Sequence, residues 1–390
     1  MTYFGLNRKN INDIIKILPW NSEILGAPRN RASMHDYVKT FPSWGRIELQ
    51  DEMSFEKDIA DLPVFFRTQD FCQRYSPFVA QLYNGRIWGC NGAVIGKGDY
   101  FISDVSREFN KGMNIDHSIY YTLKQVKSRY LKGNTAVIGT AGANIYYHWM
   151  MDVLPRLSIL SRIISLDEID YFVTQYDGLP FQQETLEKAG ISSKKILASN
   201  GRLNFHVKAE NLYVPSFAGP LDQPGSFQVN YLRTLFADHM GNKTPYRNIY
   251  ISREKTGRRQ IINEEELLHY LSLYEFEKFH TEEMTVAEQA SLFSSAKIIV
   301  CSHGSALTNL AFCMRGTSVL DIFNTSHINS CFWFLSRINL LNYQYMCGTP
   351  VSIDGNPKND HTKVDLEAFK MILRNIGLDE KEKYAKKRQN

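Results

Sequence analysis

From about residue 133 onward, short apolar runs alternate with stretches whose apolar residues recur at helical spacing. Such runs, bounded by turn or cap residues, are typical of strands buried on both faces of a parallel sheet. We predict two sets of strands, at residues 135–139, 169–174 and 211–215, and at residues 248–252, 297–301 and 318–323. We predict helices in the second set at about residues 263–272, 285–295 and 304–313. The alternation indicates an α/β fold with two sheets.

The length of the chain favours two domains, because 390 residues exceed the size at which one hydrophobic core usually keeps growing. Breaks rich in glycine and proline separate the strand sets at Gly219–Gly225 and at Gly241–Pro245, with a helical pattern between them. We place the boundary near residue 241. The predicted parts are a first domain of residues 1–240, a second domain of residues 241–375 and a charged tail of residues 376–390. Alternating runs such as Gln81–Trp88 predict a β-rich N-terminal portion of the first domain.

A candidate catalytic pair follows the strand that ends at Gly139. If the next helix includes His148, then His148 and Asp152 are four residues apart and share one face. An imidazole with a pKa of about 6.5 beside a carboxylate can act as a general base on a hydroxyl group. Pro155 opposes a regular helix here, because it lacks an N–H group and clashes with the preceding turn. The alternative is therefore a helix that begins later, with Asp152 as its N-cap.

A basic loop leaves the predicted strand at residues 248–252. Its four cations within seven residues are Arg253, Lys255, Arg258 and Arg259. Cations at the carboxyl end of a strand are well placed to neutralise a diphosphate, and arginine can bind it with a two-pronged fork. The alternative is a solvated, charged loop.

A third candidate, Ser302–Leu310, directly follows the strand at residues 297–301. Backbone N–H groups at the start of the predicted helix can bind an anion, and the small residues Gly304, Ser305 and Ala306 after His303 allow close approach. The segment lacks the Gly-x-Gly-x-x-Gly spacing of dinucleotide sites and the Gly-Lys-Ser/Thr ending of a P-loop. The alternative is a tight turn that needs glycine for packing alone.

Weaker candidates for nucleoside contacts follow other strands. His280, Glu282 and Glu283 could line a nucleoside pocket or an exposed loop, and Asp321 could meet a ribose hydroxyl or cap a turn. No Asp-x-Asp pair occurs in a setting that suggests a metal-bridged diphosphate, and the histidines lack tight metal spacing. We therefore expect a metal-independent reaction without a cofactor.

Charge and cysteine content narrow the class of protein. The net charge is +4, from 45 basic and 41 acidic residues, without a concentrated basic face, so nucleic acid is not an expected partner. The six cysteines form no Cys-x-x-Cys pair, and we interpret them as reduced, mostly buried thiols. Met1–Trp20 lacks the pattern of a signal peptide, and about 18 consecutive apolar residues occur nowhere, so a cytoplasmic protein is expected. The basic end of the tail is either a solvated helix end or a peripheral contact with the inner face of the plasma membrane.

In this order, the three main candidates resemble glycosyltransferase family 61, which includes bacterial capsular-polysaccharide enzymes and eukaryotic xylosyl- and N-acetylglucosaminyltransferases. The matching pieces are Tyr147–Trp149 with Asp152 and Leu154–Leu157, Ser252-Arg253 with Arg259 and Asn263-Glu264, and Glu288-Gln289 with His303-Gly304 and Leu307–Asn309. They cover roughly residues 139–323. Two departures are Ser305-Ala306, where the family commonly shows Ala-Gly, and Asp321, where it often shows Glu. The methyl group of Ala306 lies where the backbone has to approach phosphate.

The resemblance implies a GT-B architecture of two facing Rossmann-like domains, with an acceptor-side N-terminal domain, a donor-side C-terminal domain and inversion at the anomeric carbon. It implies donor-phosphate contacts for Arg253 and Arg259, and a diphosphate-binding turn at His303 and Gly304. Lys255, Ser305, Ala306 and Asn309 complete the expected donor site.

The predicted function is inverting transfer of a sugar from a nucleotide-sugar donor, UDP-linked, to a glycan or lipid-linked glycan in capsular or other surface polysaccharide synthesis. Asp152 or His148, singly or as a pair, would be the base. One alternative is a nucleotide-sugar epimerase, which would turn over the donor without an acceptor. Another is a non-catalytic scaffold that binds the nucleotide sugar within a polysaccharide assembly complex.

Overall fold

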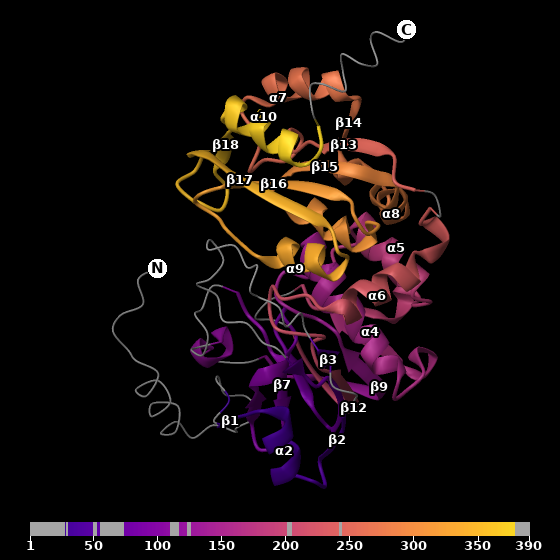
Figure 1. Cartoon of the computed structure of the whole chain (residues 1–390). Coiled ribbons are helices and arrows are strands. Elements are labelled where there is room, and N and C mark those ends of the chain that lie inside the picture. Colours follow the sequence, from indigo (N-terminus) through magenta and orange to yellow (C-terminus); the bar gives the residue numbers. More distant parts are fainter. Residues whose placement is uncertain are drawn as a thin grey trace. The chain divides into compact units, whose positions relative to one another are not determined.

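The computed structural model describes residues 28, 30–49, 53–54, 74–109, 117–122, 126–200, 205–241 and 244–378 (Figure 1). The chain divides into two compact units: unit 1 holds residues 1–53 and 74–219, and unit 2 holds residues 54–73 and 220–390. Each unit contains its own large sheet. A mixed α/β fold with two sheets is therefore confirmed, and each unit is described by itself.

Unit 1 contains a ten-stranded sheet that forms a half-barrel. Its parallel strands, in the spatial order β12-β9-β10-β11, are β9 (Arg129–Val137), β10 (Tyr171–Thr174), β11 (Ile196–Ala198) and β12 (His206–Pro215). The chain runs outward from β9 to β10 and β11 and then crosses to the other side of β9 to form β12. In open α/β sheets, ligands bind at the carboxyl ends of the strands where the order reverses in this way. In unit 1 that point lies between β9 and β12.

The rest of this sheet comes from the N-terminal portion. Its strands are β1 (Asn30–Ala32), β2 (Gly45–Leu49), β5 (Phe78–Tyr83), β6 (Arg86–Trp88), β7 (Ala93–Gly96) and β8 (Tyr100–Ile102). Strand β12 pairs antiparallel with β6 along its first residues and with β5 along its last ones. The run Gln81–Trp88 thus turns between β5 and β6, at Asn84 with φ of 56°. The prediction of a β-rich N-terminal portion is confirmed for the described residues.

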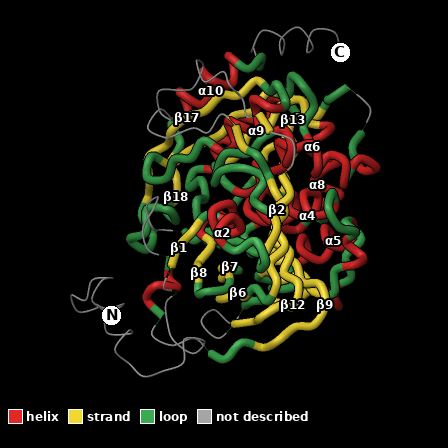
Figure 2. Tube along the Cα trace, turned by 90° about the horizontal axis from the view of Figure 1, so that it is seen from below, coloured by secondary structure: helices red, strands yellow, loops and turns green. Residues whose placement is uncertain are grey.

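The helices of unit 1 lie mainly beside its parallel strands. They are α2 (Met34–Thr40), α3 (Tyr146–His148), the π-helical turn η4 (Trp149–Val153), α4 (Leu154–Ser161) and α5 (Pro180–Lys188). Figure 2 shows α4 and α5 on the same side of β9 and β12. Short 3₁₀ turns and a small two-stranded ladder complete the described elements before residue 220: η2 (Ser103–Val105), η3 (Ser118–Tyr121), η5 (Leu166–Glu168), η6 (Ser193–Lys195), β3 (Met53–Ser54) and β4 (Arg74–Tyr75).

Unit 2 contains a six-stranded sheet in the spatial order β14-β13-β15-β16-β17-β18. Its strands are β13 (Arg247–Ile251), β14 (Phe276–Phe279), β15 (Ala296–Ser302), β16 (Ser318–Asn324), β17 (Asn342–Val351) and β18 (His361–Lys363). The first five are parallel and β18 is antiparallel. In chain order the parallel strands follow the doubly wound pattern 2-1-3-4-5, whose switch point lies between the strands in positions 1 and 3. In unit 2 these are β13 and β15.

Helices cover both faces of the sheet in unit 2. They are α6 (Ser226–Leu235), α7 (Glu264–Leu271), α8 (Val286–Ser295), the 3₁₀ helix η11 (Ser305–Phe312), α9 (Cys331–Ile338) and α10 (Leu366–Asn375), with the turns η8 (Ala237–His239), η9 (Ser272–Tyr274) and η10 (Thr281–Glu283). Leu267 of α7 and Phe369 of α10 pack against Val300 and Leu320 on one face. Figure 1 shows α8 and α9 away from α7 and α10. Because the sheet is covered on both faces, its central strands consist mainly of apolar residues.

The six predicted strands all occur, with ends within about two residues of the prediction except that β9 and β12 begin six and five residues earlier. The predicted helices at 263–272 and 285–295 are α7 and α8, and the one at 304–313 is the 3₁₀ helix η11. Sequence reasoning missed β11 and β17. Strand β11 has only three residues, with half-buried or exposed side chains, and β17 alternates buried and exposed positions.

The break between the units lies at Gly219-Pro220, whereas the sequence prediction puts the boundary near residue 241 and assigns α6 to the first domain. Helix α6 belongs to unit 2, where Arg233 donates hydrogen bonds to the carbonyl groups of Ala311 (3.1 Å) and Cys313 (3.0 Å).

Five of the six cysteines lie in the described part of the chain, where none of them forms a disulfide bond; Cys301, Cys313 and Cys331 are buried. Cys72 and most of the predicted tail lie outside the described residues. Within the described ranges, none of the helices has the length and apolar character needed to cross a membrane.

Arg156 of α4 joins the ends of two central strands of unit 1. Its side chain is fully buried. Nε and Nη2 donate to the carbonyl oxygen of Pro215, at 3.0 and 2.7 Å, and Nη1 donates to that of Gly139 at 2.6 Å. Gly139 follows β9 and Pro215 ends β12, so this guanidinium group holds the helix against the switch point of the sheet.

We expect Arg156→Met to lower the free energy of unfolding by roughly 3–5 kcal/mol, because it leaves two buried carbonyl groups without their charged donor. Urea denaturation followed by circular dichroism measures the change. Arg162→Met, at an exposed position one turn further on, is the matched control and should stay within about 0.5 kcal/mol. A loss of similar size in both variants would contradict the role of Arg156.

Candidate functional site

The first candidate site lies on a helix that follows β9. Helices α3 and α4 are continuous through the π-helical turn η4, so His148 and Asp152 lie inside one helical segment. The alternative in which Asp152 is an N-cap is therefore wrong. Pro155 lies in the first turn of α4, directly after the widened turn, where its missing N–H group is tolerated. Single π-helical turns inside α-helices are frequent at functional sites.

The carboxylate of Asp152 has two partners. Its Oδ2 lies 2.8 Å from Nδ1 of His148, and its Oδ1 accepts a hydrogen bond from Nη1 of Arg107 at 3.2 Å. Arg107 also donates to the carbonyl oxygen of Gly219, and its guanidinium lies 3.7 Å from the ring centroid of Phe217. These two contacts fix the carboxylate of Asp152 against the imidazole of His148.

The imidazole of His148 is also fixed by its ring neighbours. The ring of Phe109 lies 4.5 Å away between centroids, and that of Tyr147 lies 5.1 Å away, edge-on. A side chain at Gly142, where φ is +69°, would overlap Phe109. With Nδ1 bonded to Asp152, Nε2 is the nitrogen that can accept a proton from a substrate hydroxyl.

The second candidate site lies at the switch point of unit 2. Arg253 follows β13, and His303 and Gly304 follow β15, the neighbouring strand. A methyl group placed on Gly304 would overlap the guanidinium group of Arg253, so the two segments are in contact. The backbone of Gly304 is extended, with φ of 175°, a conformation open to any residue. Glycine is therefore required here for space and not for backbone freedom.

Two arginines are crowded together at this edge. The pKa of Arg253 is lowered by burial. The pKa of Arg259 is lowered to about 9, by burial and then by the nearby charges of Arg253 and Arg258. The Nε atoms of Arg253 and Arg259 are buried, and neither has a hydrogen-bond partner among the described residues. Guanidinium groups that repel each other and have unused Nε donors favour the binding of an anion.

The loop that carries these arginines is anchored to β15. The hydroxyl of Ser302 donates to the carbonyl oxygen of Arg259 at 3.0 Å. The backbone N–H of Arg259 donates to the carbonyl oxygen of Asn359 at 3.1 Å. Arg259 has φ of +55°, in the left-handed region that a residue with a long side chain rarely adopts. Backbone strain of this kind is concentrated at functional sites, where the surrounding contacts hold it.

His303 is held by a buried acceptor. Its Nδ1 lies 3.0 Å from Oδ2 of Asp321, which also accepts a hydrogen bond from the hydroxyl of Tyr343 at 2.8 Å. Burial, followed by the charge of Asp321, raises the pKa of Tyr343 well above its usual range, so this hydroxyl remains a donor. The ring of His303 stacks on Phe323, with centroids 4.2 Å apart. Asp321 is fully buried beneath His303, so the prediction that it meets a ribose hydroxyl is wrong.

A further histidine, His327, lies beside this region, beyond β16. Its ring centroid lies 6.0 Å from that of His303. Its pKa is lowered to about 4, by burial and then by the charges of His303 and Arg259, with smaller effects of Lys358 and Arg258. An anion bound here would reverse this effect, because negative charge favours the protonated imidazole.

The remaining residues of the predicted donor site divide into two groups. Ser305 and Ala306 are partly exposed in the first turn of η11, where backbone N–H groups lack partners within the helix. Asn309 is fully buried and donates to Oε1 of Gln289 at 2.6 Å, so it ties η11 to α8. Lys255 pairs with Glu283 at 2.6 Å on an exposed part of the loop.

The weaker candidates are engaged with that same loop. His280 lies 3.1 Å from Glu254, and Glu283 is the partner of Lys255. These contacts place both residues in an ion-pair network and give no separate support for a nucleoside pocket.

Sequence reasoning missed Arg107, Phe109, His327 and Tyr343. Arg107 and Phe109 lie in the irregular N-terminal portion, where no periodicity connects them to a helix that begins almost forty residues later. Tyr343 lies on β17, which the pattern of apolar residues does not reveal. Among the described residues, no three His, Cys, Asp or Glu side chains are arranged to hold a metal ion.

The model of a known family, Glycosyltransferase 61, matches residues 146–320. The match begins at the first residue of α3 and ends within β16, so it includes His148, Asp152, Arg253, Arg259 and His303. None of the curated proteins matches the chain.

We expect the anion affinity of unit 2 to depend on pH through Arg259. A guanidinium group attracts an anion only while it is protonated. The contribution of Arg259 should therefore be complete below about pH 8 and should be lost as the pH rises through about 9. Calorimetric titration with inorganic pyrophosphate, for the wild type and for Arg259→Met, measures it.

Dividing the affinity of the wild type by that of Arg259→Met cancels the effect of the titration of pyrophosphate itself. This ratio should fall toward one at high pH. Arg315→Met, an exposed arginine in unit 2, is the control and should match the wild type throughout. A ratio that stays constant from about pH 7 to about pH 10 would contradict the assignment.

We expect Gly304→Ala to weaken pyrophosphate binding by about tenfold or more, because the added methyl group displaces the guanidinium of Arg253. Gly257→Ala is the matched control: it lies in the same loop, and an added methyl group there meets no atom within 4 Å. Thermal unfolding checks that both variants are folded. Equal affinities in the two variants would show that Gly304 has no part in positioning Arg253.

Proposed function

Since residues 146–320 belong to glycosyltransferase family 61, we propose that this chain transfers a sugar from a UDP-linked donor to a glycan acceptor, with inversion at the anomeric carbon. The observation that carries the proposal is the cluster at the switch point of unit 2. There Arg253, Arg259 and the Gly304 turn combine positive charge, unused donors and room for close approach. A diphosphate has the charge and the number of acceptor oxygens to use all three.

The donor part of the mechanism rests on fixed charge. When the bond between the anomeric carbon and the diphosphate oxygen breaks, its electron pair goes to the diphosphate, whose negative charge increases. Arg253, Arg259, His303 and the N–H groups at the start of η11 stabilise that charge without having to reorganise, because the surrounding contacts hold them in place. Such groups can supply the role that a divalent cation has in other transferases, so the proposed reaction is independent of metal.

The acceptor part of the mechanism uses the pair in unit 1. The geometry favours His148 as the base, with Nε2 taking the proton of the acceptor hydroxyl as its oxygen attacks the anomeric carbon. Asp152 is then a positioning residue: it fixes the tautomer of His148 and stabilises the imidazolium that forms. Arg107 holds Asp152 in place. Attack from the face opposite the diphosphate inverts the anomeric configuration.

Several finer points belong to this proposal and come from the resemblance to the family. They are the GT-B architecture, the uridine base of the donor, a glycan or lipid-linked glycan acceptor in capsular or other surface polysaccharide synthesis, and a cytoplasmic location with peripheral contact to the inner face of the plasma membrane. The use of unit 1 for the acceptor and unit 2 for the donor is the functional division that this architecture requires.

The test is a transfer assay with a panel of UDP-sugars and glycan acceptors, in buffer containing EDTA. We expect release of UDP only when an acceptor is present, and a product whose anomeric configuration, measured by NMR, is opposite to that of the donor. Turnover of the UDP-sugar without an acceptor would indicate an epimerase or hydrolase. Binding of UDP without any product would indicate a non-catalytic scaffold.

In the same assay, we expect His148→Ala to lower the transfer rate by about 10²–10⁴-fold, the usual contribution of a general base, with UDP affinity unchanged. Asp152→Asn should lower the rate less and shift its pH profile, because the amide still accepts from Nδ1 but no longer stabilises the imidazolium. His35→Ala, an exposed histidine on α2 of unit 1, is the matched control. Wild-type rates in His148→Ala would remove the assigned base.

A further inference from the structure

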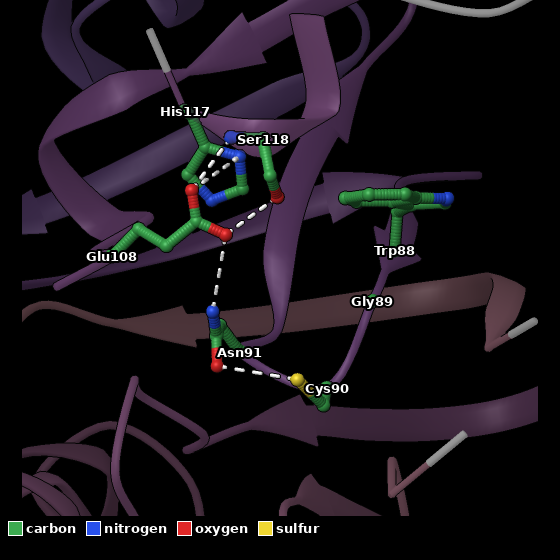
Figure 3. A pocket seen from close by; sticks show the side chains of 7 residues that line it. All are labelled: Trp88, Gly89, Cys90, Asn91, Glu108, His117 and Ser118. Carbon is green, nitrogen blue, oxygen red and sulfur yellow. Dashed lines mark hydrogen bonds and ion pairs between the residues drawn. The ribbon is translucent and has the colours of Figure 1, made fainter. Parts of the chain in front are cut away.

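A cavity of about 300 Å³ lies in unit 1, apart from the two sites described above (Figure 3). Its lining residues are Trp88, Gly89, Cys90, Asn91, Glu108, His117 and Ser118. The volume lies at the lower end of the range for small-molecule sites, so it suits a ligand of about the size of one ring.

One wall of the cavity is aromatic. Trp88 ends β6, and its side chain packs into a small core with Phe101, Ile119 and Tyr120. Figure 3 shows the indole edge-on, above Gly89 and Cys90, with Glu108 across the cavity from it. The indole is only 2% exposed, so its position is fixed by the core. That core covers the faces of the ring, so the indole closes one side of the cavity without offering an open face for stacking.

The opposite wall is a carboxylate held by three donors. Glu108 accepts hydrogen bonds from the backbone N–H of Ser118 (2.6 Å), from its hydroxyl (2.5 Å) and from the side-chain amide of Asn91 (3.3 Å). Oε2 also faces Nδ1 of His117 at 4.0 Å, but that nitrogen accepts a hydrogen bond from the N–H of Ile119 (3.2 Å). A carboxylate offers about four acceptor positions, so Glu108 can accept one more hydrogen bond from a ligand hydroxyl. Its negative charge disfavours a phosphate in this cavity. The cavity therefore suits a neutral ligand of about one ring that carries hydroxyl groups.

The cavity adjoins the catalytic pair along the chain. Arg107, before Glu108, contacts Asp152 at 3.2 Å, and the ring of Phe109, after it, lies 4.5 Å from that of His148. Consecutive Cα atoms are only about 3.8 Å apart, so one three-residue segment borders both the cavity and the pair. All of these residues belong to unit 1.

We propose that this cavity is a subsite for one sugar residue of the acceptor glycan, a residue next to the one whose hydroxyl is glycosylated. The indole of Trp88 closes one side of the subsite, and Glu108 accepts a hydrogen bond from one of the hydroxyl groups of that sugar. That the bound sugar belongs to the acceptor rests on the proposed function. Binding of a sugar in the cavity is a property of unit 1 and can be measured without a donor.

The binding experiment uses the full chain without nucleotide and a panel of probes: the methyl glycosides of glucose, galactose, N-acetylglucosamine and xylose, and β-linked disaccharides of the same sugars. Saturation-transfer NMR identifies the sugar that binds, and titration gives its affinity. We expect Glu108→Gln to weaken that binding by about tenfold or more, the effect of losing a hydrogen bond to a charged group. Glu187→Gln, an exposed carboxylate on α5, is the matched control and should bind as the wild type does.

Ser118→Ala is the second variant, because it removes only one of the donors that hold Glu108. It should weaken binding by a smaller factor and leaves the inference testable if Glu108→Gln does not fold. In the transfer assay, both variants should raise the KM for a disaccharide acceptor, with kcat and UDP affinity unchanged, and should leave the KM for a monosaccharide acceptor as it is.

The outcomes separate this inference from the proposed function. Transfer with an unchanged acceptor KM in folded Glu108→Gln and Ser118→Ala overturns the subsite and leaves the transferase in place. Sugar binding that depends on Glu108, without transfer or UDP binding, supports a sugar site and overturns the proposed function. Absence of binding by every probe, together with wild-type acceptor kinetics in both variants, overturns the subsite.

Discussion

The repulsion between two buried guanidinium groups is the constraint around which the site in unit 2 is arranged. Burial, and then the charges of Arg253 and Arg258, lower the pKa of Arg259 to about 9. The buried carboxylate of Asp321 contacts His303 and Tyr343. A diphosphate relieves the repulsion between the two guanidinium groups as it binds.

Both units orient a histidine in the same way. In unit 1 the carboxylate of Asp152 binds Nδ1 of His148 and is itself held by Arg107; in unit 2 the carboxylate of Asp321 binds Nδ1 of His303 and is held by Tyr343. Each imidazole is thereby fixed in orientation and tautomer, with Nε2 left for the ligand. In the proposed reaction, the first takes a proton from the acceptor and the second faces the leaving diphosphate.

Most of the second half of the fold could be predicted from the chain, because strands of a parallel sheet with helices on both faces are nearly all apolar. The same rule explains the misses. Strand β17 is part of the sheet, but its side chains alternate in exposure. A pattern that looks for continuous apolar runs therefore did not predict this strand or the position of Tyr343. For Asp321, the sequence placed a carboxylate near the end of β16 but could not show whether it points to solvent or beneath a neighbouring ring. The structure shows it fully buried beneath His303.

The sequence by itself determined local relations: that His148 and Asp152 lie four residues apart after a strand, and that Arg253 and His303 each follow a buried strand. The structure then showed that one helical segment contains both His148 and Asp152. Only the tertiary structure decided that β13 and β15 are neighbours, which brings Arg253 against Gly304, and that Arg107 reaches Asp152 from a distant part of the chain. The physical reason is that periodicity reports the burial of one element at a time. Strand order and long-range side-chain contacts depend instead on how whole elements pack together.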